Sequence, residues 1–202
     1  MIEKSSRHSK IIGNFGEQLI GNWLSRSGFE VALVDHTGID IIAFNKKWNK
    51  RIGITVKSRT RTEGKENDDV FVFRHSKSER QKLLEACDAF ACDPYIGVYV
   101  ETSKFADIYL LSLEHYDKKY RLDPMNKTES WKMSEKNQRE YEKDSDLKHI
   151  KIEFSLNNWN WGNVTIFAET PITEKTEEIG EEAQCRNYLR ENKREIGYGR
   201  TV

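Results

Sequence analysis

Hydrophobic residues in the first part of the chain recur either at helical spacing or in short continuous runs. The helical spacing predicts one helix over residues 14–27, which Gly28 would end, and a second over residues 76–90. The short runs are rich in β-branched and aromatic residues and are bounded by turn residues, so they predict strands. These strands cover residues 29–34, 39–44, 51–58, 70–73, 95–100 and 106–113. The order of the elements predicts an α/β fold with a central mixed sheet flanked by helices.

The pattern changes after residue 113. Residues 114–147 are densely charged, and the segments beyond them are patterned again. The predicted elements are a helix over 133–144, strands over 149–156 and 164–168, and a helical tail within 173–195. We therefore divide the chain into a core of residues 1–113 and an elaboration of residues 114–202, which holds a charged insertion, additional strands and the tail.

Composition narrows the class of protein. The 202 residues are 37% hydrophobic and 33% charged, and no apolar run approaches the length that crosses a membrane. We expect a cytoplasmic globular protein without a membrane segment. Three dispersed cysteines form no Cys-x-x-Cys pair, so neither a disulfide framework nor a zinc site is expected. The net charge is zero, but residues 1–62 carry 11 Lys and Arg against 5 Asp and Glu, a local basic surface that suits a polyanion.

Candidate chemistry lies on the second and third predicted strands, which a polar loop joins into a hairpin. If Phe44 pairs with Arg51, then Asp40 faces Thr55 across the strands. Because side chains alternate along a strand, Lys57 shares a face with Thr55. We therefore expect Asp40, Thr55 and Lys57 to converge on one patch, and a register slip of one residue would separate them.

Such a patch suits the metal-assisted cleavage of a phosphodiester. Mg²⁺ prefers carboxylate oxygens, a carbonyl and retained waters, and Asp40 offers the carboxylate. A neighbouring lysine such as Lys57 can orient the attacking water or stabilise the charge that develops. Thr55 supplies only a hydroxyl, which is a poor substitute for a second carboxylate ligand.

A family resemblance covers residues 12–100, a little less than half of the chain. It is carried by Gly16-Glu17, Gly38-Ile39-Asp40, Val56-Lys57-Ser58-Arg59, a helix with Gln81 and Leu83-Leu84, and the strand Pro94-Tyr95-Ile96-Gly97-Val98-Tyr99-Val100. In order and spacing these parts resemble the PD-(D/E)xK nuclease superfamily, most closely its archaeal Holliday-junction-resolvase and Mrr-like branches. The resemblance implies a restriction-endonuclease-like core for the predicted α/β fold.

The resemblance also implies roles for individual residues. The catalytic candidates are Glu17, Asp40, Thr55 and Lys57. The candidate ligands of Mg²⁺ or Mn²⁺ are Asp40, Glu17 and the backbone carbonyl of Val56. The candidate nucleic-acid contacts are Arg59, Arg61 and Gln81. The implied function is a metal-dependent endonuclease that acts on duplex or branched DNA, as a homodimer by family analogy.

Several alternatives stay open. Thr55 stands where the family usually carries an acid, and Glu79 or Glu85 on the second predicted helix are candidates to replace it. If neither does, the chain is a catalytically inactive DNA- or protein-binding module; an RNA-directed nuclease is a further alternative. Glu17 also has a purely structural interpretation, because it lies three residues after Asn14 and would complete a capping box there.

Overall fold

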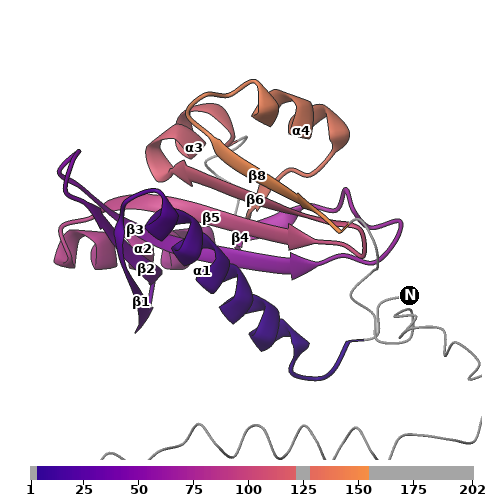
Figure 1. The fold of residues 1–202 in the computed structure, drawn as a ribbon, viewed down its shortest axis with the longest axis horizontal. Helices are drawn as coiled ribbons and strands as arrows, with labels where there is room; N and C mark the ends of the chain where they lie inside the picture. Colours follow the sequence, from indigo (N-terminus) through magenta and orange to yellow (C-terminus); the bar gives the residue numbers. More distant parts are fainter. Residues whose placement is uncertain (1–3, 122–127, 155–202) are drawn as a thin grey trace, which may run out of the picture. The chain divides into compact units, whose positions relative to one another are not determined.

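The computed structural model describes residues 4–121 and 128–154, which form four helices and eight strands (Figure 1). The helices are α1 (His8–Arg26), α2 (Ser76–Ala89), α3 (Leu113–Lys119) and α4 (Glu135–Glu142). The strands are β1 (Glu30–His36), β2 (Ile39–Asn45), β3 (Lys50–Thr60), β4 (Val70–Phe73), β5 (Asp93–Glu101), β6 (Phe105–Ser112), β7 (Glu129–Trp131) and β8 (Lys148–Glu153). The predicted strand 164–168 and the predicted helical tail lie outside the described residues. No helix in the described ranges is long and apolar enough to span a membrane.

Six strands form one mixed sheet in the order β1-β2-β3-β5-β6-β8, and β4 pairs with β7 in a small second sheet. Neighbours in the large sheet are antiparallel except β3 and β5, which run parallel. The parallel pair needs a long crossover, and β4 and α2 supply it. The α/β fold with a central mixed sheet that the sequence predicts is confirmed.

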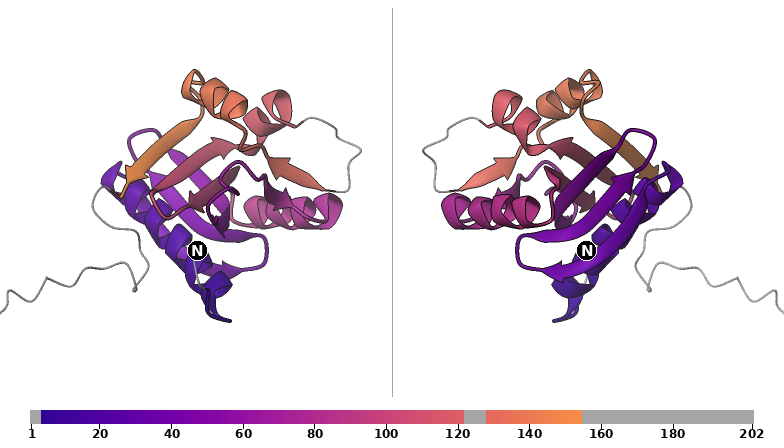
Figure 2. Two further views of the ribbon diagram at one scale, coloured as in Figure 1. Left: turned by 90° about the vertical axis from the view of Figure 1, so that its right-hand side faces the viewer. Right: turned by 90° about the vertical axis from the view of Figure 1, so that its left-hand side faces the viewer.

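Helices cover both faces of this sheet, as the edge-on views of Figure 2 show. Hydrophobic side chains of α1, including Ile20 and Leu24, pack with Ile54 of β3 on one face. Leu83 and Cys87 of α2 pack on the other face with Ile96 of β5. The central strands are therefore buried on both sides, which explains their nearly continuous hydrophobic runs.

Helix α1 differs from its prediction in both its start and its buried face. It begins at His8 rather than at residue 14, so Asn14 is no N-cap and the capping box with Glu17 is wrong. Its buried stripe is Ile12, Gly16, Ile20, Gly21 and Leu24. Glycines carry no hydrophobic signal, so the sequence does not mark Gly16 and Gly21 as buried, whereas here they let the helix approach the sheet closely.

The region after residue 113 contains more regular structure than predicted. The predicted exposed helix and half-buried strand are present as α4 and β8, and β8 extends the main sheet beside β6. Helix α3 and strand β7 were not predicted. Each is short, and a three-residue strand or seven-residue helix leaves too few positions for a periodicity to emerge.

Candidate active site

The turn between β1 and β2 lies directly against helix α2. Gly38 occupies this turn with φ +107°, and a Cβ atom added there would lie 2.3 Å from the carbonyl oxygen of Lys82. Only glycine accepts both the left-handed backbone and this contact. Gly38 thus brings the beginning of β2, where Asp40 lies, next to α2.

The predicted register of the β2–β3 hairpin is confirmed, since Phe44 pairs with Arg51 and Ile41 with Ile54. The ladder ends there, and one residue further the Asp40 carboxylate replaces a strand partner: its Oδ2 accepts a hydrogen bond of 2.6 Å from the backbone N–H of Val56. Since the N–H and C=O of one strand residue point to the same side, the carbonyl of Val56 faces the same gap.

Asp40, Thr55 and Lys57 come together in a polar cleft of about 180 Å³, which we call the Asp40 cleft. Its lining residues are Gly38, Asp40, Thr55, Lys57, Phe73, Glu79 and Lys82. Within it, Lys57 Nζ donates a hydrogen bond of 3.2 Å to Thr55 Oγ1. Thr55 is buried, whereas Asp40 and Lys57 are half-buried, so the charged groups remain accessible from the cleft.

Glu17 reaches the same charges from α1, on the other side of β3. A Cβ atom on Gly16 would lie 2.2 Å from Ser58 Oγ, so the helix touches β3 at the residue before Glu17. The pKa of Glu17 is raised, first by burial and then by the negative charge of Asp40, although Lys57 opposes the rise. Glu17 does not line the Asp40 cleft, but it is electrostatically coupled to both of its central residues.

The structure distinguishes Glu79 from Glu85, the two candidates to replace the acid that is missing at Thr55. Glu79 lines the cleft, and its Oε2 accepts a hydrogen bond of 3.0 Å from the backbone N–H of Arg74. Glu85 is exposed and accepts a hydrogen bond from Gln81, away from the residues that line the cleft. Gln81 itself is exposed on α2.

Positive charge collects where β3 leaves the cleft. Arg59 has its pKa lowered, first by burial and then by the neighbouring charges of Arg74 and Arg61. Arg61 donates to the backbone carbonyls of Asp68 and Asp69, which fixes its guanidinium without neutralising it. Arg59 is repelled by both Arg61 and Arg74, and guanidinium groups gathered in this way form a surface that suits anionic groups.

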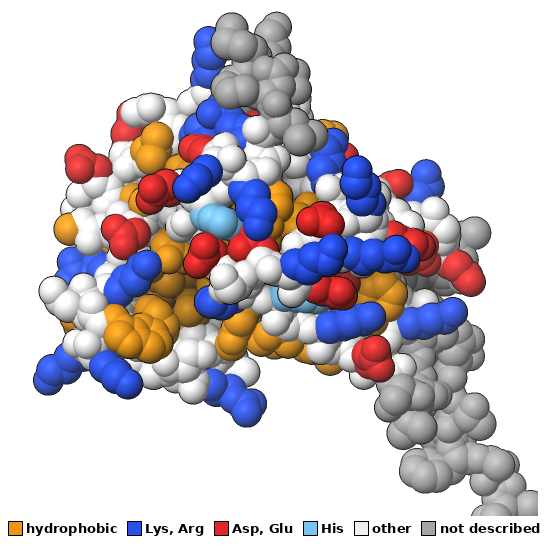
Figure 3. Space-filling model, turned by 90° about the horizontal axis from the view of Figure 1, so that it is seen from above, with side chains coloured by type: hydrophobic (Ala, Val, Ile, Leu, Met, Phe, Trp, Pro, Cys, Tyr) orange, Lys and Arg blue, Asp and Glu red, His pale blue; other side chains and the backbone are white. Residues whose placement is uncertain are grey.

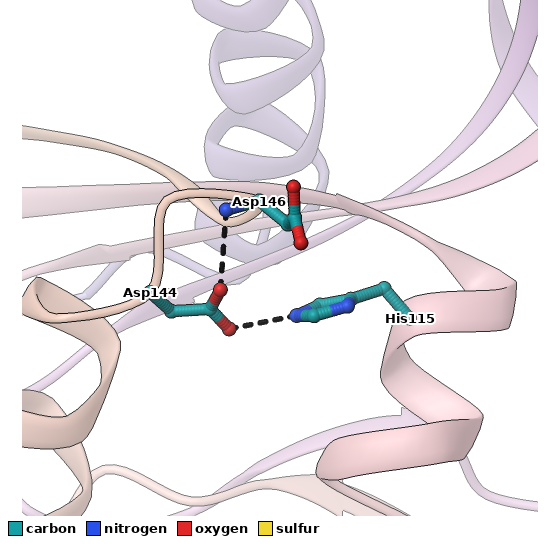
Figure 4. Close-up of side chains that lie close together, drawn as sticks. All are labelled: His115, Asp144 and Asp146. Atoms are coloured by element: carbon teal, nitrogen blue, oxygen red, sulfur yellow. Dashed lines mark hydrogen bonds and ion pairs between the residues drawn. The ribbon is translucent and has the colours of Figure 1, made fainter.

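A second acidic centre lies between α3 and the start of β8, and the sequence analysis missed it. We call it the Asp144 centre: His115, Asp144 and Asp146 offer ligand atoms that all lie within 4.8 Å of one another (Figure 4). His115 Nε2 lies 2.7 Å from Asp144 Oδ2, and the Asp146 N–H donates to Asp144 Oδ1. His115 and Asp144 are 29 positions apart, which is no recognisable motif spacing, so no signal pointed to this centre.

The carboxylate of the Asp144 centre is already neutralised by the protein. Lys119 Nζ lies 2.9 Å from Asp144 Oδ2, and the Tyr120 hydroxyl donates to the same oxygen. Burial by itself would raise the pKa of Asp144, but these groups and His115 hold that pKa well below its usual range. A cation would have to displace an ammonium group from this carboxylate, so the surroundings do not fit a metal.

The Asp40 cleft fits a divalent cation better than the Asp144 centre does. Within the described ranges, however, its acids do not form a tight group of ligand atoms like that of the Asp144 centre. It combines the carboxylates of Asp40 and Glu79, the carbonyl of Val56 and, from the far side, Glu17. The pKa of Glu17 is raised, first by burial and then by the charge of Asp40, although the charge of Lys57 opposes the rise. Hard oxygen donors of this kind are the ligands that Mg²⁺ and Mn²⁺ prefer.

Comparison with known proteins finds structural similarity to solved structures. No protein-family model and no curated protein matches this chain. Among solved structures, Archaeoglobus fulgidus Hjc, described as a Holliday junction resolvase from an archaeal hyperthermophile, is similar with a TM-score of 0.44 and 17% sequence identity. The match covers 60% of this chain and 84% of that one. So distant a similarity transfers no activity to this chain.

Proposed function

We propose that the protein is a metal-dependent endonuclease that hydrolyses DNA phosphodiester bonds at the Asp40 cleft. The observation that carries this proposal is the convergence of Asp40 and Lys57 in one accessible polar cleft, with Glu17 coupled to both. In one small cleft, a carboxylate can bind a cation while an ammonium group contacts the reacting phosphate.

The donor atoms around the cleft support binding of Mg²⁺ or Mn²⁺. Asp40 would be a carboxylate ligand through the oxygen that does not accept from Val56, and the Val56 carbonyl would be a second ligand. Glu17 would hold the cation or one of its waters. When bound, the cation supplies neutralisation of phosphate charge and a water of lowered pKa.

Lys57 would act on the reacting groups themselves. Its ammonium group is held by the hydroxyl of Thr55, which leaves two of its three protons for a water or a phosphate oxygen. In that position Lys57 would orient the attacking water and stabilise the negative charge that develops on the phosphate. Thr55 thereby acquires a positioning role in place of the acid that the resemblance leads one to expect.

Glu79 would supply the missing acid from helix α2. It lines the cleft opposite β3, whereas Glu85 points its carboxylate toward Gln81 at the exposed surface. Because Glu79 accepts one backbone N–H through Oε2, its other oxygen is available to a cation. The cleft thus regains two carboxylates without an acid on β3.

DNA would be held by the arginines beside the cleft. Arg59 lies close enough to Arg61 and Arg74 to be repelled by both, and phosphate groups would relieve that repulsion. Cleavage of both strands of a duplex or a branched junction would require two active sites. We therefore propose a homodimer as the active form.

A second candidate function is a DNA-binding module without nuclease activity. The hydroxyl at Thr55 favours it, because a hydroxyl bonded to Lys57 contributes little to holding a cation. This protein would retain the basic surface and bind DNA with a strong dependence on salt.

Cleavage of supercoiled plasmid and of a four-way junction, with Mg²⁺ or Mn²⁺ and with chelator, separates the two functions. Wild-type protein should cut only with metal, and Asp40→Ala and Lys57→Ala should abolish cutting while they retain DNA binding. Binding without cutting by the wild type, at high protein concentration with either metal, would establish the module instead. Cutting that survives both substitutions would place the active site elsewhere.

A further inference from the structure

A hydrophobic cavity of about 370 Å³ lies at the other end of β3 from the Asp40 cleft. Its wall includes four aromatic side chains and two lysines: Trp23, Phe29, Trp48, Tyr95, Lys50 and Lys148. Figure 3 shows one face of the molecule, on which hydrophobic side chains gather in a recessed area with Lys and Arg side chains around them. Lys50 and Lys57 are separated by seven residues of strand, or about 23 Å. The cavity is therefore distinct from the cleft.

The hairpin that closes one side of the cavity is rigidly built. Asn45 is 4% exposed, donates to the carbonyl of Gly28 and accepts the backbone N–H of Trp48. The ring of Trp48 meets that of Phe29 edge to face, with centroids 5.8 Å apart. Trp48 nevertheless stays 57% exposed. A large aromatic ring fixed from below and open to solvent is a preformed stacking surface.

Charge around the cavity selects the kind of ligand. Lys46 and Lys47 are exposed on the same hairpin, and Lys50 lies 5.2 Å from the centre of the Tyr95 ring. Among the described residues, Asp146 is the one acid on the wall, and Asp93 acts on Lys50 from nearby. Ammonium groups at this density repel a cationic ligand and attract phosphates, so an anionic ligand with an aromatic part fits the site.

We propose that this aromatic cavity binds a base of an unpaired DNA strand, with the hairpin lysines holding the adjoining phosphates. Stacking on Trp48 is tolerant of base identity because every base has a flat aromatic face. The site would thus recognise unpairing rather than sequence. This inference rests on the proposed function only for the identity of the ligand as DNA. It adds that the substrate contains an unpaired stretch, a feature that the Asp40 cleft alone does not recognise.

Fluorescence anisotropy of a labelled single-stranded DNA oligonucleotide tests this proposal in chelator, where no cleavage occurs. Trp48→Ala should weaken binding at least about fivefold, which is the lower end of what one stacked base contributes. Trp48→Phe keeps a ring and should recover most of the affinity. Phe90→Ala is the matched control, because Phe90 is also an exposed ring in edge-to-face contact, with His36, but does not line the cavity.

An abasic oligonucleotide of the same length separates stacking from phosphate attraction. The wild type should bind it as weakly as Trp48→Ala binds the normal strand, and Lys47→Ala should lower the dependence of binding on salt for both. Equal affinity for normal and abasic strands, unchanged affinity in Trp48→Ala, or no binding by the wild type would each overturn the proposal. An RNA strand preferred over DNA would overturn the choice of DNA. None of these outcomes depends on cleavage, so failure of the nuclease proposal is recognised separately.

Discussion

The Asp40 cleft and the Asp144 centre both gather acidic side chains, yet the protein treats them in opposite ways. Asp144 is buried, and three side-chain donors on α3 and its C-terminal end neutralise it. Asp40 accepts one backbone N–H, and its negative charge adds to burial in raising the pKa of Glu17, which lies on the other side of β3. The carboxylate of Asp144 is held by side chains of the fold, whereas that of Asp40 lines an accessible cleft.

This difference shows why distance between acids is a poor guide to a metal site. The Asp144 centre has the tighter geometry, but its charge already serves to join α3 to the segment before β8. The Asp40 cleft is looser, but folding leaves its charge available for a ligand. Sites that bind charged ligands generally retain such unfavourable interactions. The following predictions test this division of roles.

The largest effect on stability should come from Asp144→Ala. Removal of the carboxylate leaves His115, Lys119 and Tyr120 without their common partner and should cost about 3 kcal/mol in the free energy of unfolding, measured with urea. Asp40→Asn, which keeps an acceptor for Val56, should cost less than about 1 kcal/mol. A larger loss at Asp40 than at Asp144 would reverse the assigned roles.

The dependence of stability on pH should also show that the charged form of Asp144 stabilises the fold. The folded pKa of Asp144 lies below its unfolded value near 3.8, so its contribution is full above that value and declines as pH falls toward the folded pKa. The difference in stability between the wild type and Asp144→Ala should therefore be constant above about pH 5 and shrink in more acidic solution. A difference that grows on acidification would contradict the assignment.

Glu79→Gln should have the next largest effect, on cleavage. If Glu79 replaces the acid missing at Thr55, loss of its charge should reduce metal-dependent cleavage about 100-fold. Glu85→Gln, on the same helix and exposed, should change the rate less than about twofold. Equal rates in the two variants would remove Glu79 from the site.

Gly38→Ala should disturb the Asp40 cleft through the backbone. The added methyl group would meet the Lys82 carbonyl at a left-handed residue, and we expect a loss of about 2 kcal/mol together with weakened cleavage. Gly64 has a similar φ of +82° but open space around it, so Gly64→Ala should cost only about 1 kcal/mol. Comparable losses at both glycines in thermal unfolding would show that the contact with α2 is unimportant.

The smallest effect should be a gain in stability from Glu17→Gln. The raised pKa means that folding disfavours the charged form, so this acid destabilises the protein at neutral pH and ceases to do so once it is protonated. The variant should be more stable by less than about 1 kcal/mol at pH 7, and the gain should disappear below about pH 4. A loss of stability at pH 7 would mean that Glu17 is already satisfied.

The sequence predicted the centre of the cleft because the relevant contacts are local. The polar loop fixed the pairing of Phe44 with Arg51, and the alternation along β3 then placed Lys57 beside Thr55, as the structure has them. Hairpin register depends on nearby residues, so a single sequence contains the information. The roles assigned to these residues stay predictions.

Features that depend on contacts between distant elements escaped prediction. The sequence could not choose between Glu79 and Glu85, because only the packing of α2 on Gly38 decides which one faces the cleft. Glu17 was open to a capping interpretation because the buried stripe of α1 includes Gly16, which looks like a gap in the hydrophobic pattern. The Asp144 centre joins elements 29 residues apart in a highly charged segment, where no periodicity singles out its members.

Binding of Mn²⁺, followed by electron paramagnetic resonance in the absence of DNA, tests the central claim most directly. The account predicts that the wild type binds Mn²⁺, that Asp40→Asn weakens binding at least about tenfold, and that Asp146→Asn leaves it unchanged. Asp146 is exposed, so its substitution should not disturb the fold. Binding that is lost in Asp146→Asn and kept in Asp40→Asn would place the cation at the Asp144 centre and contradict the account.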